Sequence, residues 1–273
     1  MSRASLAWLA AVGLAFTPAL LDLARLWASV PYYSHGFLVP VFAWAAASAH
    51  RRELGPIGVH PASGWVWIPV LGAYALGVAS ASVSLQGLAL VGAMAAGVFQ
   101  LWGAAGLRLL AFPLLFLLFM VPPPPALVSP FIGWLQLQVS IASVEVLRAA
   151  GFSIAREGNL LLQPGGESLF IAEACSGITS LLTLTPLAVA LAWYTERAWG
   201  RRLLIVASVV PLAMAANLLR VVAITLATKR WGGASVLESS WHEIGGLATF
   251  ALACAGLLAV SCVVKWERNG AEA

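Results

Sequence analysis

The chain has 273 residues, of which 61% are hydrophobic and only 10% are charged, and its mean hydropathy is +0.90. A soluble globular domain carries about 45–50% apolar and about 25% charged residues. The 11 acidic and 15 basic side chains are too few to cover a water-facing surface of this size. The composition therefore excludes an ordinary soluble enzyme and predicts a polytopic membrane protein, because each helical span needs about 20 apolar residues.

The net charge of +4 does not indicate nucleic-acid binding, because most basic residues lie in short runs between apolar stretches, where they orient membrane spans. The three cysteines form neither a metal-site pattern nor a disulfide framework. The sequence implies no metal and no organic cofactor. The first apolar run lacks a cleavage site followed by a polar mature domain and is interpreted as a span. No second soluble domain is visible, and we expect a single integral-membrane domain over 1–273.

A series of apolar runs follows in chain order, and each is a candidate helix. A transporter built from inverted repeats would show two matching halves, which this sequence lacks. The runs lie at about 5–26, 35–49, 64–82, 84–105, 107–121, 126–149, 176–194, 202–226 and 242–264.

Basic residues in the short loops predict the orientation of these runs, because cytoplasmic loops are enriched in Lys and Arg. All of them lie in the cytoplasm, together with both termini, if the run 126–149 does not cross the membrane. That condition gives about eight spans. The basic residues in question follow the second, fourth, seventh and last runs: Arg51, Arg52, Arg108, Arg197, Arg201, Arg202, Lys265 and Arg268.

The run 126–149 is more polar than the others and follows the helix breaker Pro122–Pro125. A helix of this kind is expected to be interfacial or partly re-entrant. The predicted fold class is an all-α polytopic membrane protein with about eight transmembrane helices and one interfacial amphipathic helix. Polar side chains recur along this run: Gln136, Gln138, Ser140, Ser143, Glu145 and Arg148.

The stretch 150–175 is the longest polar piece of the chain. The predicted topology places it outside, which is the periplasm in a bacterium with two membranes. Two strand-like runs, 159–163 and 168–172, flank Pro164-Gly165-Gly166 and predict a short β-hairpin. This periplasmic hairpin would directly precede Cys175.

Cys175 lies in Glu173-Ala174-Cys175-Ser176-Gly177, where the outside loop turns into the run 176–194. The positive end of a helix dipole raises the thiolate fraction of a cysteine at the helix start. A small buried residue is an equally good interpretation of this position alone. Cys254 and Cys262 lie among Ala, Leu and Val in the last run and are interpreted as core residues.

Arg220 and His242 are predicted at the same outer face as Cys175. A helix from Arg202 to Arg220 covers about 27 Å at about 1.5 Å per residue, which is close to one hydrocarbon thickness. Asn217 shares the helix face of Arg220, although snorkelling of Arg220 to the interface is the alternative. His242 opens the last run, one membrane crossing before Lys265, where a capping or interfacial role is the alternative.

A cysteine, a histidine and an arginine at one face are sufficient for acyl transfer. The thiolate attacks a carbonyl and forms a thioester, and the histidine takes and returns the proton. The arginine stabilises the developing oxyanion or holds a substrate carboxylate. The spacing of the three residues permits their convergence but does not prove it.

Several motifs of the chain resemble those of the exosortase family, which comprises integral-membrane, sortase-like enzymes related to archaeosortases. The resemblance covers nearly the whole chain and implies a membrane cysteine protease and transpeptidase. The motifs occur in the family's order: Tyr33-Ser34-His35-Gly36-Phe37-Leu38-Val39-Pro40, Phe112-Pro113-Leu114-Leu115-Phe116-Leu117 with Val121-Pro122-Pro123-Pro124, Glu173-Ala174-Cys175-Ser176-Gly177-Ile178 followed by Ser180, Asn217-Leu218-Leu219-Arg220, and His242-Glu243-Ile244-Gly245-Gly246.

The resemblance implies an exported protein substrate with a carboxy-terminal sorting tail, made of a Pro-Glu-Pro type motif, a transmembrane helix and a basic cluster. Cys175 would be the nucleophile, with Arg220 and His242 completing the catalytic triad, and the acyl group would pass to water or to an exopolysaccharide-related acceptor. Either His242 carries the proton and Arg220 stabilises charge, or these two roles are exchanged. The candidate substrate-binding or supporting residues are Asn217, Glu173, Ser176 and His35.

The resemblance and the topology together predict a multi-pass protein of the bacterial inner membrane, with its active site at the periplasmic face and the lipid bilayer as its surroundings. Two non-catalytic interpretations stay open. One is a transporter or channel, and the other is an assembly factor of an envelope exopolysaccharide system, which would tolerate the loss of Cys175. For His35 an interfacial role, and for Glu173 a capping role, are the alternatives.

Overall fold

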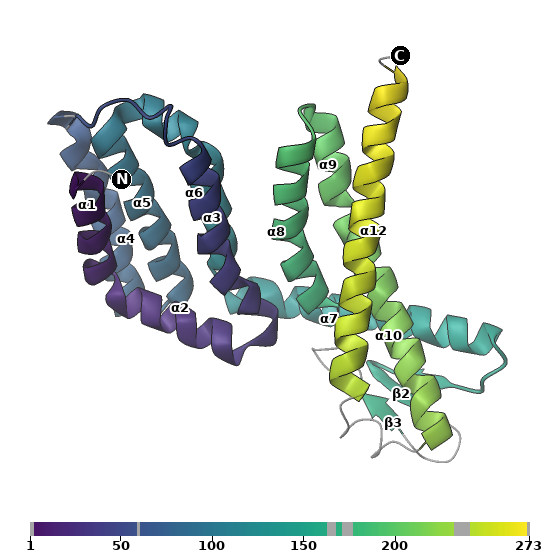
Figure 1. Cartoon of the computed structure of the whole chain (residues 1–273). Helices are drawn as coiled ribbons and strands as arrows, with labels where there is room; N and C mark the ends of the chain where they lie inside the picture. Colours follow the sequence, from purple (N-terminus) through teal and green to yellow (C-terminus); the bar gives the residue numbers. More distant parts are fainter. Residues whose placement is uncertain (1–2, 59–60, 163–167, 171–176, 232–240, 272–273) are drawn as a thin grey trace. The chain divides into compact units, whose positions relative to one another are not determined.

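The computed structural model of the chain describes residues 3–58, 61–162, 168–170, 177–231 and 241–271 (Figure 1). Most of these residues are helical, as the composition predicts. The chain divides into two compact units, Met1–Pro124 and Pro125–Ala273. Each unit is described by itself, and a single domain over 1–273 stays a prediction.

Unit 1, Met1–Pro124, consists of short helices and one long helix. A bend of 70° separates α1 from α2, inside the run 5–26 that the sequence predicts as one span. Pro18 lies in the first turn of α2, where its ring and its missing N–H interrupt the preceding helix. The elements of the unit are α1 (Arg3–Ala15), α2 (Thr17–Ser29), η1 (Pro31–Phe37), α3 (Leu38–Ala49), η2 (Pro61–Val66), α4 (Trp67–Ala79), α5 (Val83–Leu109), α6 (Ala111–Phe116) and η3 (Leu117–Met120).

Aromatic side chains connect the elements of unit 1. Phe16, at the bend between α1 and α2, is 1% exposed, and its ring centroid lies 4.4 Å from that of Tyr74 in α4. The indole N–H of Trp27 donates a hydrogen bond of 3.0 Å to the carbonyl of Met120, which ties α2 to η3. The bend and the short helices are therefore packed parts of the unit.

Unit 2, Pro125–Ala273, combines helices with a small antiparallel sheet. In Figure 1, α8, α9 and α12 lie side by side, whereas α7 runs crosswise to them. Gly177 begins α8 in a left-handed conformation with φ of 80°, which glycine adopts without a steric penalty. The elements are α7 (Pro125–Ala149), β1 (Ala155–Glu157), β2 (Leu160–Leu162), β3 (Ser168–Phe170), α8 (Ile178–Thr195), α9 (Trp199–Ala207), α10 (Val209–Trp231) and α12 (Trp241–Ala271).

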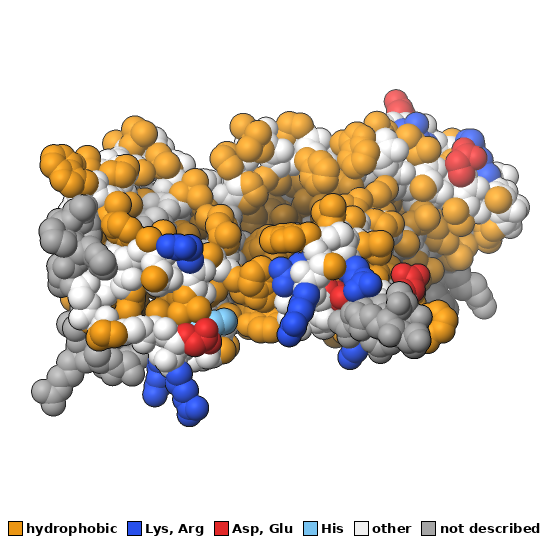
Figure 2. All heavy atoms as spheres, turned by 90° about the horizontal axis from the view of Figure 1, so that it is seen from above, with side chains coloured by type: hydrophobic (Ala, Val, Ile, Leu, Met, Phe, Trp, Pro, Cys, Tyr) orange, Lys and Arg blue, Asp and Glu red, His pale blue; other side chains and the backbone are white. Residues whose placement is uncertain are grey.

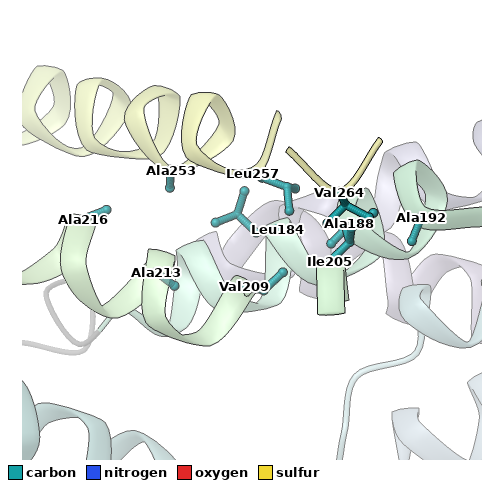
Figure 3. Packing of buried hydrophobic residues seen from close by; sticks show 10 residues of the cluster. All are labelled: Leu184, Ala188, Ala192, Ile205, Val209, Ala213, Ala216, Ala253, Leu257 and Val264. Carbon is teal, nitrogen blue, oxygen red and sulfur yellow. The ribbon is translucent and has the colours of Figure 1, made fainter. Parts of the chain in front are cut away.

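The core between α8, α9, α10 and α12 is built largely from small side chains (Figure 3). Small residues let membrane helices approach closely, because packing rather than the hydrophobic effect drives their association in lipid. A methyl group built on Gly256 of α12 would lie 2.7 Å from Cδ2 of Leu212 in α10, so these two helices are in direct contact. The buried residues of this core are Leu184, Ala188, Ala192, Ile205, Val209, Ala213, Ala216, Ala253, Leu257 and Val264.

A second core joins α7, the sheet and α10. Leu161 of β2 is fully buried and packs with Leu147 of α7 and Val221 of α10. The strands follow the order β1-β2-β3, and Leu160 pairs with Phe170 in the β2–β3 register. The sequence predicts strands near β2 and β3 but not β1, and residues 163–167 between β2 and β3 lie outside the described residues.

Among the described residues, five helices are long and apolar enough to cross a membrane, or up to six if the bent pair of α1 and α2 counts as one span. They include α5, α7, α8, the stretch Trp199–Thr228 and α12 without its ends. About eight spans were expected, but α3, α4 and α6 are shorter than a full crossing. Figure 2 shows hydrophobic side chains over much of the visible face, and Leu247 is 71% exposed. The chain is a multi-pass membrane protein.

Candidate active site

Some of the candidate residues lie in the described helices, and others lie outside the described residues. Arg220 and Asn217 lie in α10, and His242 lies in the first turn of α12, where its side chain is outside the described part. Cys175, Glu173 and Ser176 directly precede α8 and also lie outside the described residues. The site is therefore built from the neighbours of these residues along the chain.

The start of α8 lies against α10 through Gly177 and Asn217. A methyl group built on Gly177 would lie 3.1 Å from Cβ and 3.3 Å from Cγ of Asn217, which is closer than the usual contact of about 3.5–4.0 Å. Asn217 is 4% exposed. The absence of a side chain at residue 177 thus allows a buried amide to approach the chain two residues beyond Cys175.

The start of α12 lies against α10 through Gly246 and Arg220. A methyl group built on Gly246 would lie 3.2 Å from Nη2 and 3.3 Å from Cζ of the half-buried Arg220. The Nε atom of Arg220 is also buried. Since Gly246 follows His242 by about one helical turn, the guanidinium lies beside the first turns of the helix that carries His242.

These two contacts bring the chain neighbours of the three candidate residues to one place. Asn217 and Arg220 are about one turn apart on α10, and α10 packs against both α8 and α12. The sheet lies at the same end of the unit as the first turn of α12 (Figure 1). A cysteine before α8, an arginine on α10 and a histidine in the first turn of α12 are residue types that acyl transfer can use.

Two polar residues of α7, Gln136 and Ser140, form hydrogen bonds with the β1–β2 turn. Gln136 and Ser140 are 8% and 0% exposed. The side-chain amide of Asn159 donates a 3.0 Å hydrogen bond to Oε1 of Gln136, and the hydroxyl of Ser140 donates a 3.4 Å bond to the carbonyl of Gly158. Gln136, Ser140 and Ser143 of the polar pattern are therefore buried, whereas Glu145 and Arg148 are exposed.

His35 belongs to unit 1 and anchors η1, which lies outside the candidate spans. Its Nε2 atom lies 3.1 Å from the carbonyl oxygen of Phe119 in η3 and donates a hydrogen bond to it. Burial lowers the pKa of His35, although the carbonyls of Phe119 and Tyr32 act in the opposite direction. This contact gives His35 a structural role within unit 1, and its predicted supporting role stays untested.

Gly177 and Gly246 are contact points that the sequence does not predict. Both glycines belong to the quoted motifs, and a glycine at a fixed place beside a reactive residue is the signal that would have indicated a close approach. Among the described residues, no group of three or more His, Cys, Asp or Glu side chains could hold a metal ion. The expected absence of a metal stays a prediction.

Comparison with known proteins places the chain in a family. The family model described as transmembrane exosortase matches residues 27–259. This range includes the segments around Cys175, Arg220 and His242. No curated protein sequence and no solved structure matches the chain significantly. Because the matched range covers most of its length, the chain belongs to the transmembrane exosortase family.

Proposed function

We propose that this protein is a membrane cysteine peptidase and transpeptidase of the exosortase type, with Cys175, Arg220 and His242 as its catalytic residues. One observation carries the proposal. Asn217 and Arg220, about one turn apart on α10, contact Gly177 and Gly246, which follow Cys175 and His242 in the chain. Membership of the family supports the same set of residues.

The proposed reaction has two acyl transfers. The Cys175 thiolate attacks the scissile carbonyl, the C–N bond breaks, and the leaving amine takes a proton as the thioester forms. Water or an acceptor nucleophile then attacks the thioester, gives up its proton, and the C–S bond breaks to restore the thiolate. By chemistry, His242 is the better proton carrier and Arg220 the better charge stabiliser, because arginine hardly deprotonates.

The site is proposed to lie at the outer face of the membrane. Helix α8 runs from Ile178 to Thr195, and at about 1.5 Å per residue its length is about 27 Å, which matches one bilayer core. Arg197, Arg201 and Arg202 follow its far end, and the positive-inside rule places that end in the cytoplasm. The end of α8 next to Cys175 therefore faces outward, to the periplasm in a bacterium with two membranes.

The proposed substrates are exported proteins with a carboxy-terminal sorting tail. A tail with a membrane helix and a cytoplasmic basic cluster would present its Pro-Glu-Pro type motif at the outer face, where the proposed nucleophile lies. The acceptor would be water or an exopolysaccharide-related group. These assignments rest on the family to which the chain belongs.

Processing of a tagged reporter that ends in such a tail tests the proposal. Cys175→Ala should lower the rate of reporter cleavage by about 10³-fold or more, whereas Cys254→Ala and Cys262→Ala, which remove cysteines of α12, should cleave normally. Equal cleavage by Cys175→Ala would refute the nucleophile assignment. A cell in which Cys175→Ala still supports envelope assembly would favour the assembly-factor alternative.

A chemical trap tests the thioester step directly. Hydroxylamine attacks thioesters and should convert the carboxyl end of the released reporter into a hydroxamate, which mass spectrometry detects. The product should form with the native enzyme and with Cys262→Ala, but not with Cys175→Ala. Reporter cleavage without hydroxamate under saturating hydroxylamine would contradict a thioester intermediate.

A further inference from the structure

Gly246 leaves the space in which the guanidinium of Arg220 lies. We propose that Gly246 is a positioning residue, which sets the orientation of this guanidinium at the start of α12. The inference rests on the proposed function, because it assigns Gly246 a part in the reaction that Arg220 assists. It is carried by the distances of 3.2 Å to Nη2 and 3.3 Å to Cζ of Arg220 from a methyl group built on Gly246.

The backbone at Gly246 is held in place. The hydroxyl of Thr249 donates hydrogen bonds to the carbonyls of Gly245, at 2.8 Å, and of Gly246, at 3.1 Å. Further along, α12 packs against α10 through the buried Ala253 and Ala216. The helix therefore cannot easily retreat, and a side chain added at residue 246 must displace the guanidinium instead.

The position of the Arg220 guanidinium is also restricted by α10. Arg220 is half-buried with its Nε enclosed, and Asn217, about one turn earlier on the same helix, is fixed against Gly177. The guanidinium thus lies between α10 and the backbone of α12. A shift of its planar fork would change the direction of its N–H groups toward the substrate carbonyl.

The size of the added side chain sets the expected effect. A methyl group at 3.2 Å requires a displacement of a few tenths of an ångström to reach an ordinary contact of about 3.5 Å, so Gly246→Ala should lower kcat by about 3- to 10-fold. Gly246→Val places two more carbons in the same space and should lower kcat by about 10²-fold, since misplacing a catalytic group by 1 Å can cost about that much. KM should change by less than about twofold, because ground-state binding is not the affected step.

Gly245 provides the matched control. A methyl group built on Gly245 meets no atom within 4 Å, and the residue occupies the adjacent position of the same helix. Gly245→Ala and Gly245→Val alter helix propensity as the changes at Gly246 do, but they leave the guanidinium alone. Both should keep native kcat, and a loss equal to that of the Gly246 variants would overturn the inference.

A double variant separates positioning from general damage. With Arg220→Lys the guanidinium is gone, so adding Gly246→Ala should lower the remaining kcat by less than about twofold. A further loss as large as that in the native background would show that Gly246 does not act through Arg220.

Chemical labelling tests the contact without any activity. Phenylglyoxal reacts with arginine, and mass spectrometry of the purified full chain in detergent gives the rate at Arg220. Gly246→Val should raise this rate by about 3-fold or more as the guanidinium leaves its half-buried place, and Gly245→Val should not. An unchanged rate in Gly246→Val overturns the inference. If the rate rises in Gly246→Val but the native chain cleaves no reporter, the contact is kept and the proposed function is rejected.

Discussion

At the scale of single residues, two glycines allow close approaches between helices that a side chain at the same positions would hinder. Gly177 combines a left-handed conformation with a close approach to Asn217, and Gly246 admits the guanidinium of Arg220. Each lies within about one turn of a proposed catalytic residue. Backbone without a side chain is thus the means by which α8 and α12 are brought against α10.

Gly177→Ala is expected to lose both stability and activity. A left-handed alanine costs about 1–2 kcal/mol, and its methyl group would also press on Asn217. Gly151→Ala is the matched control, because Gly151 has φ of +86° but meets no atom within 4 Å of a built methyl group. Both variants should lower the melting temperature, Gly177→Ala by more, and reporter cleavage should fall in Gly177→Ala alone. Equal cleavage by the two variants would contradict a role for the Asn217 contact.

His35 predicts a pH dependence of stability. Burial lowers its pKa below the ordinary value, so between the lowered pKa and about 6.5 the unfolded chain binds a proton that the folded chain does not. Stability is therefore complete above about pH 6.5 and falls as the pH decreases through that range. His35→Gln, which keeps an N–H donor for the carbonyl of Phe119, should lack this component when melting temperatures are compared from pH 5 to 8. A parallel pH dependence in the two proteins would be evidence against it.

At the scale of elements, Arg202 binds the backbone of the turn between α8 and α9. The Nε of Arg202 donates a 2.8 Å hydrogen bond to the carbonyl of Glu196, and its Nη2 donates a 3.4 Å bond to the carbonyl of Trp193. The guanidinium also lies 4.3 Å from the ring centroid of Trp193. A planar fork that binds two carbonyls and stacks on an indole closes this turn.

Arg202→Lys tests this role with the charge preserved. Lysine lacks the planar fork, so unfolding should become easier by about 1–3 kcal/mol, as read from denaturant unfolding in detergent. Arg197→Lys, at an exposed position of the same turn, should change stability by less than about 0.5 kcal/mol. Identical effects of the two substitutions would mean that charge alone matters here.

Among the elements, the sequence predicts some boundaries closely and misses others. The proline run ending at Pro125 stops one helix and starts α7, so the run 126–149 matches α7 almost to its ends. The run 5–26 is predicted as one helix but is bent by 70°. The bend is missed because hydropathy does not register Pro18 as a helix break. The run 107–121 becomes the short α6 and η3, with Pro113 in α6.

The sequence likewise predicts some features of the candidate site and misses others. Charge and length arguments place Arg220 and His242 at one depth, since a helix has a fixed rise per residue. They cannot predict which faces of α8, α10 and α12 meet, because apolar helices in lipid pack through small residues that recur throughout the chain. The contacts of Gly177 and Gly246 therefore emerge only when the helices are assembled.

At the scale of the whole molecule, the surface is rich in apolar side chains, unlike that of a soluble protein. The path of α7 decides on which side of the membrane the neighbouring loops lie. Hydrophobic side chains cover much of the visible face (Figure 2). The loop 150–175 and the α8–α9 turn lie on opposite sides of the membrane if α8 crosses it. With the eight spans that the sequence predicts, both termini would be inside only if α7 enters and leaves on the same side.

We predict that α7 lies in the plane of the membrane surface. It runs crosswise to α8 and α12 (Figure 1), so it cannot share their direction through the bilayer, although its length and composition would permit a crossing. Its buried side carries Gln136 and Ser140, while Phe131 and Trp134 are 41% and 47% exposed. An exposed apolar side with an aromatic anchor suits the interface between headgroups and acyl chains.

Accessibility of single cysteines tests this direction in a chain whose native cysteines are replaced. Ser129→Cys and Ala149→Cys, at exposed positions near the two ends of α7, should both react with a membrane-impermeant maleimide added to the outer face of spheroplasts. Arg197→Cys, in the α8–α9 turn, should react only after the membrane is opened. Protection of Ala149→Cys with reaction of Ser129→Cys, or the reverse, would mean that α7 crosses the bilayer. If Ala149→Cys is the protected one, the loop before Cys175 would lie in the cytoplasm, and so would the proposed site. If Ser129→Cys is the protected one, the site would stay at the outer face and the segment before α7 would lie on the other side than predicted.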